Sequence, residues 1–366
     1  MKTQLSNVNA AKLCLLVFRN KKLNCVENVN PILDVMAGYG YYFDKISFVN
    51  FSDSKEIIRA VEDGKNNYEN IIIYCPNEME NTLQSYIGKI YGAKFDAIGI
   101  LHSGNSEVFM FYSDSGNRLR FSDVKKVLDN KYCTKFDKLY VKTVGAPSEK
   151  ISEAIEKAKR ICTDLDFNVY DKYGECCIEI VYSANTSKMV LDDVTREVTK
   201  TLNNYIYAME NISLAKRLFQ ILQLRRLKIS VAESFTGGGL GNRLVNEPGI
   251  SEVYFEGLNT YSNEAKTERL GVNELTLKQY GAVSEQTAYE MAEGLLRGGN
   301  CDICIATTGI AGPKSDNTLK PVGLIYIAVG LHDTVSVYKY NLKGDRDNVT
   351  NTAINLALFL AYKTLK

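Results

Sequence analysis

The sequence is poor in several features that would place a chain of this size in a special class of proteins. Its formal net charge is only +1, because 44 lysines and arginines nearly balance 43 aspartates and glutamates. It therefore lacks the basic excess that binds nucleic-acid phosphates. No apolar run approaches the roughly 20 residues needed to span a bilayer, and the 366 residues contain no repeat or low-complexity tract. These absences indicate an ordinary globular protein of two or three domains.

Histidine and cysteine further restrict the chemistry of the chain. Only two histidines are present, His102 and His332, and His332 lies in a predicted hairpin turn, so no Ser-His-Asp triad is expected. The nine cysteines are odd in number, and several, such as Cys14 and Cys75, lie in apolar runs typical of buried thiols. We therefore predict no disulfide framework, no metal site, no cofactor, and a reducing, cytoplasmic setting.

Residues 1–137 alternate strand-like and helix-like segments. Such alternation is typical of a mostly parallel sheet covered by helices. The first apolar run is too short for a signal peptide and lacks a cleavage site, so we interpret it as a buried strand. The predicted strands are 12–18, 43–50, 70–75 and 108–112, and the predicted helices are 30–38, 55–63, 80–91 and 122–128.

Two further units follow, which makes the predicted fold class α/β with three units: 1–137, 138–205 and 206–366. The second is a small α+β module that is too short to bury a large core alone, so we expect it to dock on its neighbours. Its predicted strands are 139–144, 167–171 and 176–182, and its helices are 151–161 and 191–202. The third unit has predicted helices 213–223 and 346–365 and strands 228–232, 302–307, 322–329 and 334–341.

The third unit opens with an informative turn. An apolar strand leads into Ser234, which is followed by Thr236 and three glycines before a helical pattern begins. Such a turn exposes the serine hydroxyl at the carboxyl end of a sheet, beside N–H groups of a helix start, which suits an oxyanion or a phosphate. An ordinary capped helix start has the same local pattern. Neither a dinucleotide fingerprint nor a P-loop is present, and the turn alone leaves both interpretations open.

Further polar motifs follow this Glu-Ser-x-Thr-Gly-Gly turn. They are Tyr-Ser-Asn-Glu-Ala-Lys (261–266), Leu-Gly-Val (270–272), Gly-Ala-Val-Ser (281–284), Thr-Gly-Ile-Ala-Gly-Pro (308–313) and Gly-Asp-Arg (344–346). In this order they closely resemble the C-terminal domain of the CinA (competence/damage-inducible protein) family, over residues 206–366. Residues 138–205 resemble the KH-like linking module of that family.

The resemblance implies an amidohydrolase that converts nicotinamide mononucleotide to nicotinate mononucleotide and ammonia. With no suitable histidine, a lysine whose pKa is lowered can serve as the base. We therefore assign Ser234 as nucleophile, Lys266 as general base, and Tyr261 as the residue that orients the pair or relays the proton. A solvated helix-end lysine is the alternative for Lys266. The expected substrate-binding residues are Thr236, Gly237 and Gly238, around the oxyanion, and Thr308, Gly309 and Arg346, toward the phosphate and ribose.

The first domain departs from the family pattern. In the family this domain is MoaB/MogA-like, with a Gly-Thr-Glu-Leu element after the first strand. A Thr-Gly-Gly-Leu-Gly-Pro-Thr-x-Asp-Asp loop, linked to ADP-ribose pyrophosphatase activity, follows the third. Here the corresponding segments are 18–22 (Phe-Arg-Asn-Lys-Lys) and 76–81 (Pro-Asn-Glu-Met-Glu-Asn). Glycines that approach a phosphate and paired aspartates that hold a metal are missing, so we expect a degenerate domain without this activity.

The expected partners follow from these assignments. We expect a small-molecule nucleotide as substrate, no membrane or nucleic-acid partner, and a homodimer. The alternative function is a non-catalytic CinA-like protein that keeps the pocket for binding a nucleotide or a partner.

Overall fold

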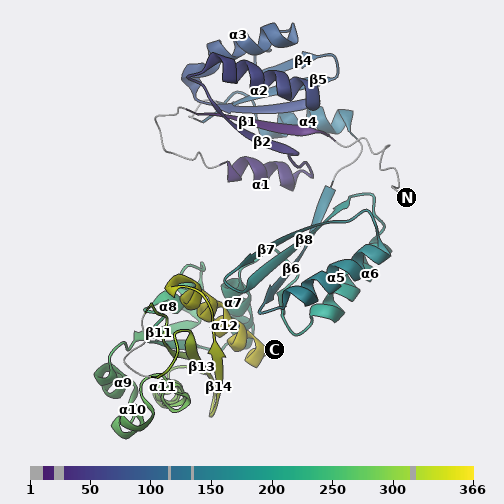
Figure 1. The fold of residues 1–366 in the computed structure, drawn as a ribbon. Coiled ribbons are helices and arrows are strands. Elements are labelled where there is room, and N and C mark those ends of the chain that lie inside the picture. The colour runs from purple at the N-terminus through teal and green to yellow at the C-terminus, as the bar shows by residue number, and fades with distance from the viewer. Residues whose placement is uncertain (1–10, 20–28, 114–116, 133–135, 314–318) are drawn as a thin grey trace. The chain divides into compact units, whose positions relative to one another are not determined.

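A computed structural model describes residues 11–19, 29–113, 117–132, 136–313 and 319–366. These residues form three separate sheets (Figure 1), so the α/β class predicted from the alternation of apolar segments is correct. Internal contacts group it into two compact units: residues 1–138 with 181–188, and residues 139–180 with 189–366. The small module and the C-terminal domain therefore belong largely to one unit. The three-part division by function stays a prediction.

The first unit is a doubly wound sheet of strand order β2-β1-β3-β5-β4, in which only β4 is antiparallel to its neighbour. Alternate residues of β1 face opposite sides: Leu16 packs with one layer of helices and Leu15 with the other. The short β4 was not predicted. The elements are β1 (Leu13–Arg19), α1 (Asn30–Gly38), β2 (Lys45–Asn50), α2 (Ser54–Asn67), β3 (Asn70–Cys75), η1 (Asn77–Met79), α3 (Glu80–Tyr91), β4 (Ile100–Ser103), β5 (Ser106–Tyr112) and α4 (Phe121–Lys131).

The turn after β3 contains no glycine loop, as its sequence predicts. Pro76 is extended, the single 3-10 turn η1 follows, and α3 begins directly at Glu80. The chain here passes from strand to helix without a glycine loop. Residues 20–28, which include most of the other departure from the family pattern, lie outside the described part of the chain.

The module is built from β6 (Phe136–Val144), α5 (Ser148–Ile161), β7 (Asp166–Lys172), β8 (Glu175–Ser183), α6 (Lys188–Leu202) and β9 (Ile206–Ala208). Its strand order is β7-β8-β6-β9, with β9 antiparallel to β6. This βαββαβ order is the split βαβ arrangement, a more specific topology than the sequence indicated. The strand β9 was not predicted from the sequence, and the sheet of the module extends through it to Ala208.

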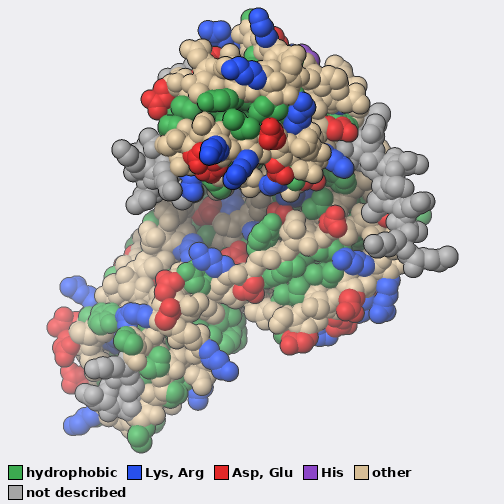
Figure 2. Space-filling view, turned by 45° about the horizontal axis from the view of Figure 1, so that its top comes forward, with side chains coloured by type: hydrophobic (Ala, Val, Ile, Leu, Met, Phe, Trp, Pro, Cys, Tyr) green, Lys and Arg blue, Asp and Glu red, His purple; other side chains and the backbone are tan. Residues whose placement is uncertain are grey.

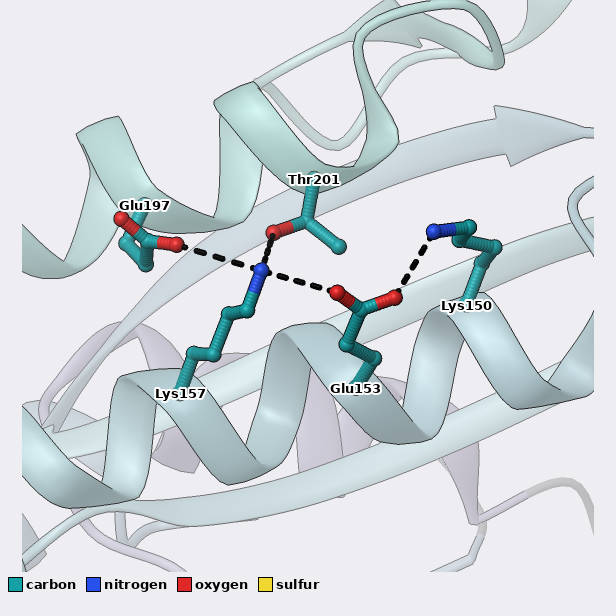
Figure 3. Close-up of polar contacts among 5 residues, drawn as sticks. All are labelled: Lys150, Glu153, Lys157, Glu197 and Thr201. Carbon is teal, nitrogen blue, oxygen red and sulfur yellow. Dashed lines mark hydrogen bonds and ion pairs between the residues drawn. The ribbon is translucent and has the colours of Figure 1, made fainter.

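The two helices of the module are joined by polar contacts on their outer side (Figure 3). Nζ of Lys157 on α5 lies 2.8 Å from Glu153 in its own helix and 3.5 Å from Glu197 on α6. It also donates to the Thr201 hydroxyl at 3.4 Å. Because these side chains are partly exposed, water screens the contacts. The helices are held mainly by buried apolar residues such as Ile151 and Val194.

The C-terminal domain is a three-layer α/β/α structure with strand order β11-β10-β12-β13-β14. The strands β11, β10 and β12 are parallel, and β13 and β14 are antiparallel additions. Ile305 of β12 packs under α7, α8 and α12, whereas Ala306 faces α9 and α11. The elements are α7 (Leu214–Arg225), β10 (Ile229–Glu233), α8 (Gly239–Val245), η2 (Ile250–Glu252), β11 (Tyr254–Asn259), α9 (Asn263–Leu270), α10 (Glu274–Tyr280), α11 (Glu285–Arg297), β12 (Ile303–Gly309), β13 (Leu324–Leu331), β14 (Thr334–Asn341) and α12 (Arg346–Leu365).

The surface shows no field of one sign on the face drawn in Figure 2, where acidic and basic side chains are interspersed. This agrees with the near-zero net charge of the sequence. Among the helices in the described ranges, none is long and apolar enough to cross a membrane.

Candidate active site

The predicted site residues meet at one edge of the C-terminal sheet. Ser234 directly follows β10, Thr260 and Tyr261 follow β11, and Thr308 and Gly309 end β12. Because these three neighbouring strands are parallel, their carboxyl ends lie at the same edge, where α/β proteins commonly bind ligands. The edge therefore brings together polar residues that are distant in the sequence.

Ser234 and Lys266 are in direct contact. Nζ of Lys266 lies 3.1 Å from Oγ of Ser234, and it also contacts the carbonyl oxygens of Thr260 at 2.8 Å and Tyr261 at 3.1 Å. A neutral amine has two N–H donors and one lone pair. If its two hydrogens point to the two carbonyls, the lone pair points at the serine hydroxyl. This arrangement suits transfer of the serine proton to the amine.

The environment of Lys266 favours that neutral form. Its side chain is only 1% exposed, and burial lowers its pKa from 10.5 to about 8, partly opposed by the negative charge of Glu264. Desolvation disfavours the charged amine, and no carboxylate among the described residues forms an ion pair with it. The alternative of a solvated helix-end lysine therefore does not fit the structure.

The start of α9 explains why Tyr261 and Lys266 meet although they are five residues apart. Ser262 is the N-cap, and its hydroxyl accepts from the Ala265 N–H at 3.1 Å. Tyr261 is therefore the residue before the cap, and Lys266 is the fourth residue of the helix. These two positions face each other at a helix start. The contact of Tyr261 is through its carbonyl oxygen. Its side chain is 63% exposed and lines the cavity in front of Ser234.

Glu233 is a site residue that sequence analysis missed. It is buried, and its carboxylate accepts from the N–H groups of Gly238 at 3.1 Å, Leu240 at 3.0 Å and Gly241 at 2.7 Å. The glycine-rich turn thus wraps around a carboxylate supplied by the protein. A buried acid placed directly before a glycine-rich helix start was the available signal, because helix N-termini attract negative charge.

Glu233 also changes which N–H groups can serve the substrate. Gly238 donates to Glu233 and Gly237 donates to the Ser234 carbonyl at 3.1 Å, so neither N–H group is free for an oxyanion. In the described part of the chain, the backbone N–H groups of Phe235 and Thr236 have no hydrogen-bond acceptor. The Thr236 hydroxyl is hydrogen-bonded to that of Thr307 at 2.8 Å.

We expect Glu233→Ala to lower the free energy of unfolding by about 3 kcal/mol or more, since two buried N–H groups and one partly buried N–H group would lose their acceptor. Urea denaturation followed by circular dichroism measures this loss. The matched control is Glu268→Ala on the exposed side of α9, which should stay within about 0.5 kcal/mol of the wild type. A neutral result for Glu233→Ala would show that water replaces the carboxylate.

A cavity of about 230 Å³ lies in front of the Ser234–Lys266 pair. Two cavities are larger. One, of about 450 Å³, lies along α9 and α10, and the other, of about 340 Å³, lies between the module and α7. Neither is lined by Ser234 or Lys266. Thr236, Gly237 and Gly238 are not among the described residues that line the smaller cavity. Its lining consists of Ser234, Phe235, Tyr261, Lys266, Ala282, Val283, Thr308, Gly309, Ile310, Ala311, Gly312 and Arg346.

Thr308 and Arg346 present different groups to the cavity. The Thr308 hydroxyl donates to the Ala282 carbonyl at 2.7 Å, so toward the cavity it can only accept. It therefore fits an N–H or hydroxyl donor of a ligand better than a phosphate oxygen. Arg346 begins α12, and its guanidinium donates to the Gly312 carbonyl at 2.8 Å. Its remaining N–H groups and the helix start favour an anion.

The histidines lie elsewhere. His102 on β4 pairs with Glu107 in the first unit, and His332 forms the turn between β13 and β14 with a φ of 51°. The predicted hairpin turn is thus confirmed. Within the described ranges, no group of three or more His, Cys, Asp or Glu side chains could hold a metal ion. No disulfide joins the seven cysteines among the described residues.

The comparisons with known proteins converge on one family. The model of the CinA C-terminal domain matches residues 211–365. A protein of Caldicellulosiruptor saccharolyticus named as competence-damage inducible is 38% identical over 244 residues, which are 64% of this chain and 59% of the relative. A CinA-like protein of Kosmotoga olearia is 38% identical over 217 residues, 58% of this chain and 53% of the relative.

A solved structure of a CinA superfamily protein from Klebsiella pneumoniae is 32% identical, covers 42% of this chain and 95% of its own, and has a TM-score of 0.41. The chain spans little more than half the length of the two curated relatives. The ordered motifs of its last third, the family model and these relatives agree, and the chain belongs to the CinA family.

Proposed function

We propose that the C-terminal domain is an amidase that hydrolyses the carboxamide of nicotinamide mononucleotide. The observation that carries the proposal is the contact between the Ser234 hydroxyl and the buried Lys266 amine in front of a cavity. A hydroxyl activated by a neutral amine is a nucleophile for acyl transfer. The substrate is inferred from the family resemblance, and Arg346 at the cavity supports a ligand that carries a phosphate.

In the proposed first half-reaction, Oγ of Ser234 attacks the carboxamide carbon and its proton passes to Nζ of Lys266. The negative charge that develops on the carboxamide oxygen would be stabilised by the N–H groups of Phe235 and Thr236. Collapse of this intermediate breaks the carbon–nitrogen bond. The proton on Lys266 goes to the leaving nitrogen, which departs as ammonia and leaves an ester on Ser234.

In the second half-reaction, water attacks the ester and gives its proton to Lys266. The intermediate collapses, Ser234 regains a proton from Lys266, and nicotinate mononucleotide leaves. The side chains of Phe235, Val283 and Ile310 supply apolar contact for the pyridine ring. No step in this scheme requires a cofactor.

The direct test is ammonia release from nicotinamide mononucleotide by the purified full-length protein, with formation of nicotinate mononucleotide followed by chromatography. Nicotinamide riboside and unrelated carboxamides form the comparison panel. If the protein binds the mononucleotide and releases no ammonia, the alternative function of a non-catalytic nucleotide-binding protein takes the place of this proposal.

Arg346→Gln is expected to raise KM for nicotinamide mononucleotide by about 10-fold or more while leaving kcat nearly unchanged, because a charged hydrogen bond to the phosphate is lost. Hydrolysis of nicotinamide riboside, which lacks the phosphate, should not change. Steady-state kinetics with both substrates measures the difference. Equal losses for both substrates would assign Arg346 to the framework of the site.

We also propose that the first unit has no ADP-ribose pyrophosphatase activity. The turn Pro76–Glu80 passes directly into α3 and offers no glycine loop for a pyrophosphate. Full-length protein supplied with ADP-ribose and Mg²⁺ or Co²⁺ should therefore release no ribose phosphate, while it releases ammonia from nicotinamide mononucleotide. Metal-dependent hydrolysis of ADP-ribose would refute this proposal and leave the amidase proposal untouched.

A further inference from the structure

The turn between β7 and β8 of the module is unusual for its sequence. Its two central residues are Tyr173 and Gly174, with φ of 56° and 69°. A two-residue hairpin turn of this kind is normally built from Asn, Asp or Gly, because a bulky side chain is strained in the left-handed region. Strained residues of this type persist where other contacts hold them in place, and they concentrate at functional positions.

The contacts that hold Tyr173 come from the C-terminal domain. Its hydroxyl donates to Oδ2 of Asp347 at 2.6 Å, and its carbonyl oxygen accepts from Nδ2 of the buried Asn355 at 3.2 Å. Both partners lie on α12. A Cβ on Gly174 would lie 3.4 Å from the Thr352 methyl group, so the backbone of the turn is packed directly against this helix.

The same contacts extend along α12, which begins at the cavity with Arg346, and to a second helix, α8. Asp347 follows Arg346 at the start of α12, and Oδ1 of Asn355 accepts from Arg243 at 3.1 Å. Arg243 lies on α8, the helix that follows Ser234. The tip of the hairpin is therefore linked by hydrogen bonds to α12 directly and to α8 through Asn355.

Tyr173 also holds the first turn of α12, in which Arg346 is the first residue. Asn351 donates to Oδ1 of Asp347 at 2.9 Å and Tyr173 donates to Oδ2, so both oxygens are engaged. The first turn of α12 is thereby fixed, and from it the guanidinium of Arg346 donates to the Gly312 carbonyl at 2.8 Å beside the cavity. Loss of the tyrosine hydroxyl would remove one of the contacts that hold this turn, and with it part of the orientation of Arg346 toward an anion.

We propose that the tip of the β7–β8 hairpin, through Tyr173, positions Arg346 and thereby sets the preference of the site for a substrate that carries a phosphate. Tyr173 is then a positioning residue, since it does not line the cavity. The module would act as a specificity element of the amidase domain. This inference rests on the proposed function and goes beyond it by assigning part of the substrate selectivity to a different sheet of the chain.

The test uses Tyr173→Phe in the full-length protein, which removes one hydroxyl. We expect KM for nicotinamide mononucleotide to rise about fivefold with kcat nearly constant, and the kinetics with nicotinamide riboside to stay unchanged. Tyr173→Asn, a residue that this turn accepts more easily, should have the same effect with an intact fold. Tyr170→Phe is the matched control, since Tyr170 lies on the same strand with its side chain 57% exposed.

A double-mutant cycle separates positioning from a general loss of stability. In the Arg346→Gln background, Tyr173→Phe should have no further effect on KM, because the group that it positions is already gone. Additive effects, equal losses with both substrates, or no effect of Tyr173→Phe would each overturn the proposal. If the wild type releases no ammonia, the proposed function fails, and calorimetric affinity for nicotinamide mononucleotide replaces KM as the readout with the same expected ratios.

Discussion

Ser234→Ala is expected to reduce ammonia release from nicotinamide mononucleotide by about three orders of magnitude or more, because the covalent route is lost with the attacking hydroxyl. The fold should survive. Ser234 lies in a turn after β10, where its hydroxyl contacts Lys266 at the cavity and takes no part in the apolar core. Ammonia release is measured beside circular dichroism and thermal unfolding of the same sample.

The matched control is Ser336→Ala on the exposed side of β14, which should retain wild-type turnover. A second comparison, binding of nicotinamide mononucleotide by Ser234→Ala, should show affinity close to that of the wild type. If Ser234→Ala kept more than about a tenth of the wild-type rate, Ser234 could not be the nucleophile.

Lys266→Arg is expected to be nearly inactive, with a loss of about 1000-fold, since a guanidinium does not accept the serine proton at neutral pH. In the wild type, a pKa of about 8 leaves about a tenth of the molecules with a neutral amine at pH 7. Therefore kcat/KM should rise about tenfold per pH unit below pH 8 and level off above it.

The pH profile is measured with the wild type and with Lys278→Arg, an exposed lysine on α10 that serves as control. A flat profile between pH 6 and 9, or full activity of Lys266→Arg, would mean that Lys266 contacts the substrate and another group is the base.

The pH dependence of stability is a separate measurement on the same lysine. Because its folded pKa is below 10.5, the unfolded chain binds more protons between pH 8 and 10.5.

The free energy of unfolding of the wild type should accordingly rise with pH across that window, by about 3 kcal/mol relative to Lys266→Met. The cost of burying the charged amine is fully present below pH 8 and is gone above 10.5. Denaturation curves at pH 7, 9 and 10.5 measure this difference. Parallel curves for the two proteins would show that Lys266 is hydrated in the folded state.

Much of the fold was predictable because its signals are local. The apolar run of β3 and the helical periodicity of α3 depend on a few consecutive residues, so these elements were predicted with their correct bounds. The strands β4 and β9 were missed because they have only four and three residues. Such short segments acquire their strand character from the neighbour with which they pair.

By itself, the sequence determined the order of the motifs, the family resemblance and the choice of Ser234, Lys266 and Arg346 as site residues, since each is carried by residue types at short spacing. Tertiary structure alone decided what these groups contact. Burial among strands distant in the chain lowers the pKa of Lys266, and Glu233 occupies the Gly238 N–H group, which was expected to hold an oxyanion. The Tyr173–Asp347 bond joins residues 174 positions apart. Desolvation and long-range hydrogen bonds depend on how whole sheets pack, and no local pattern encodes that packing.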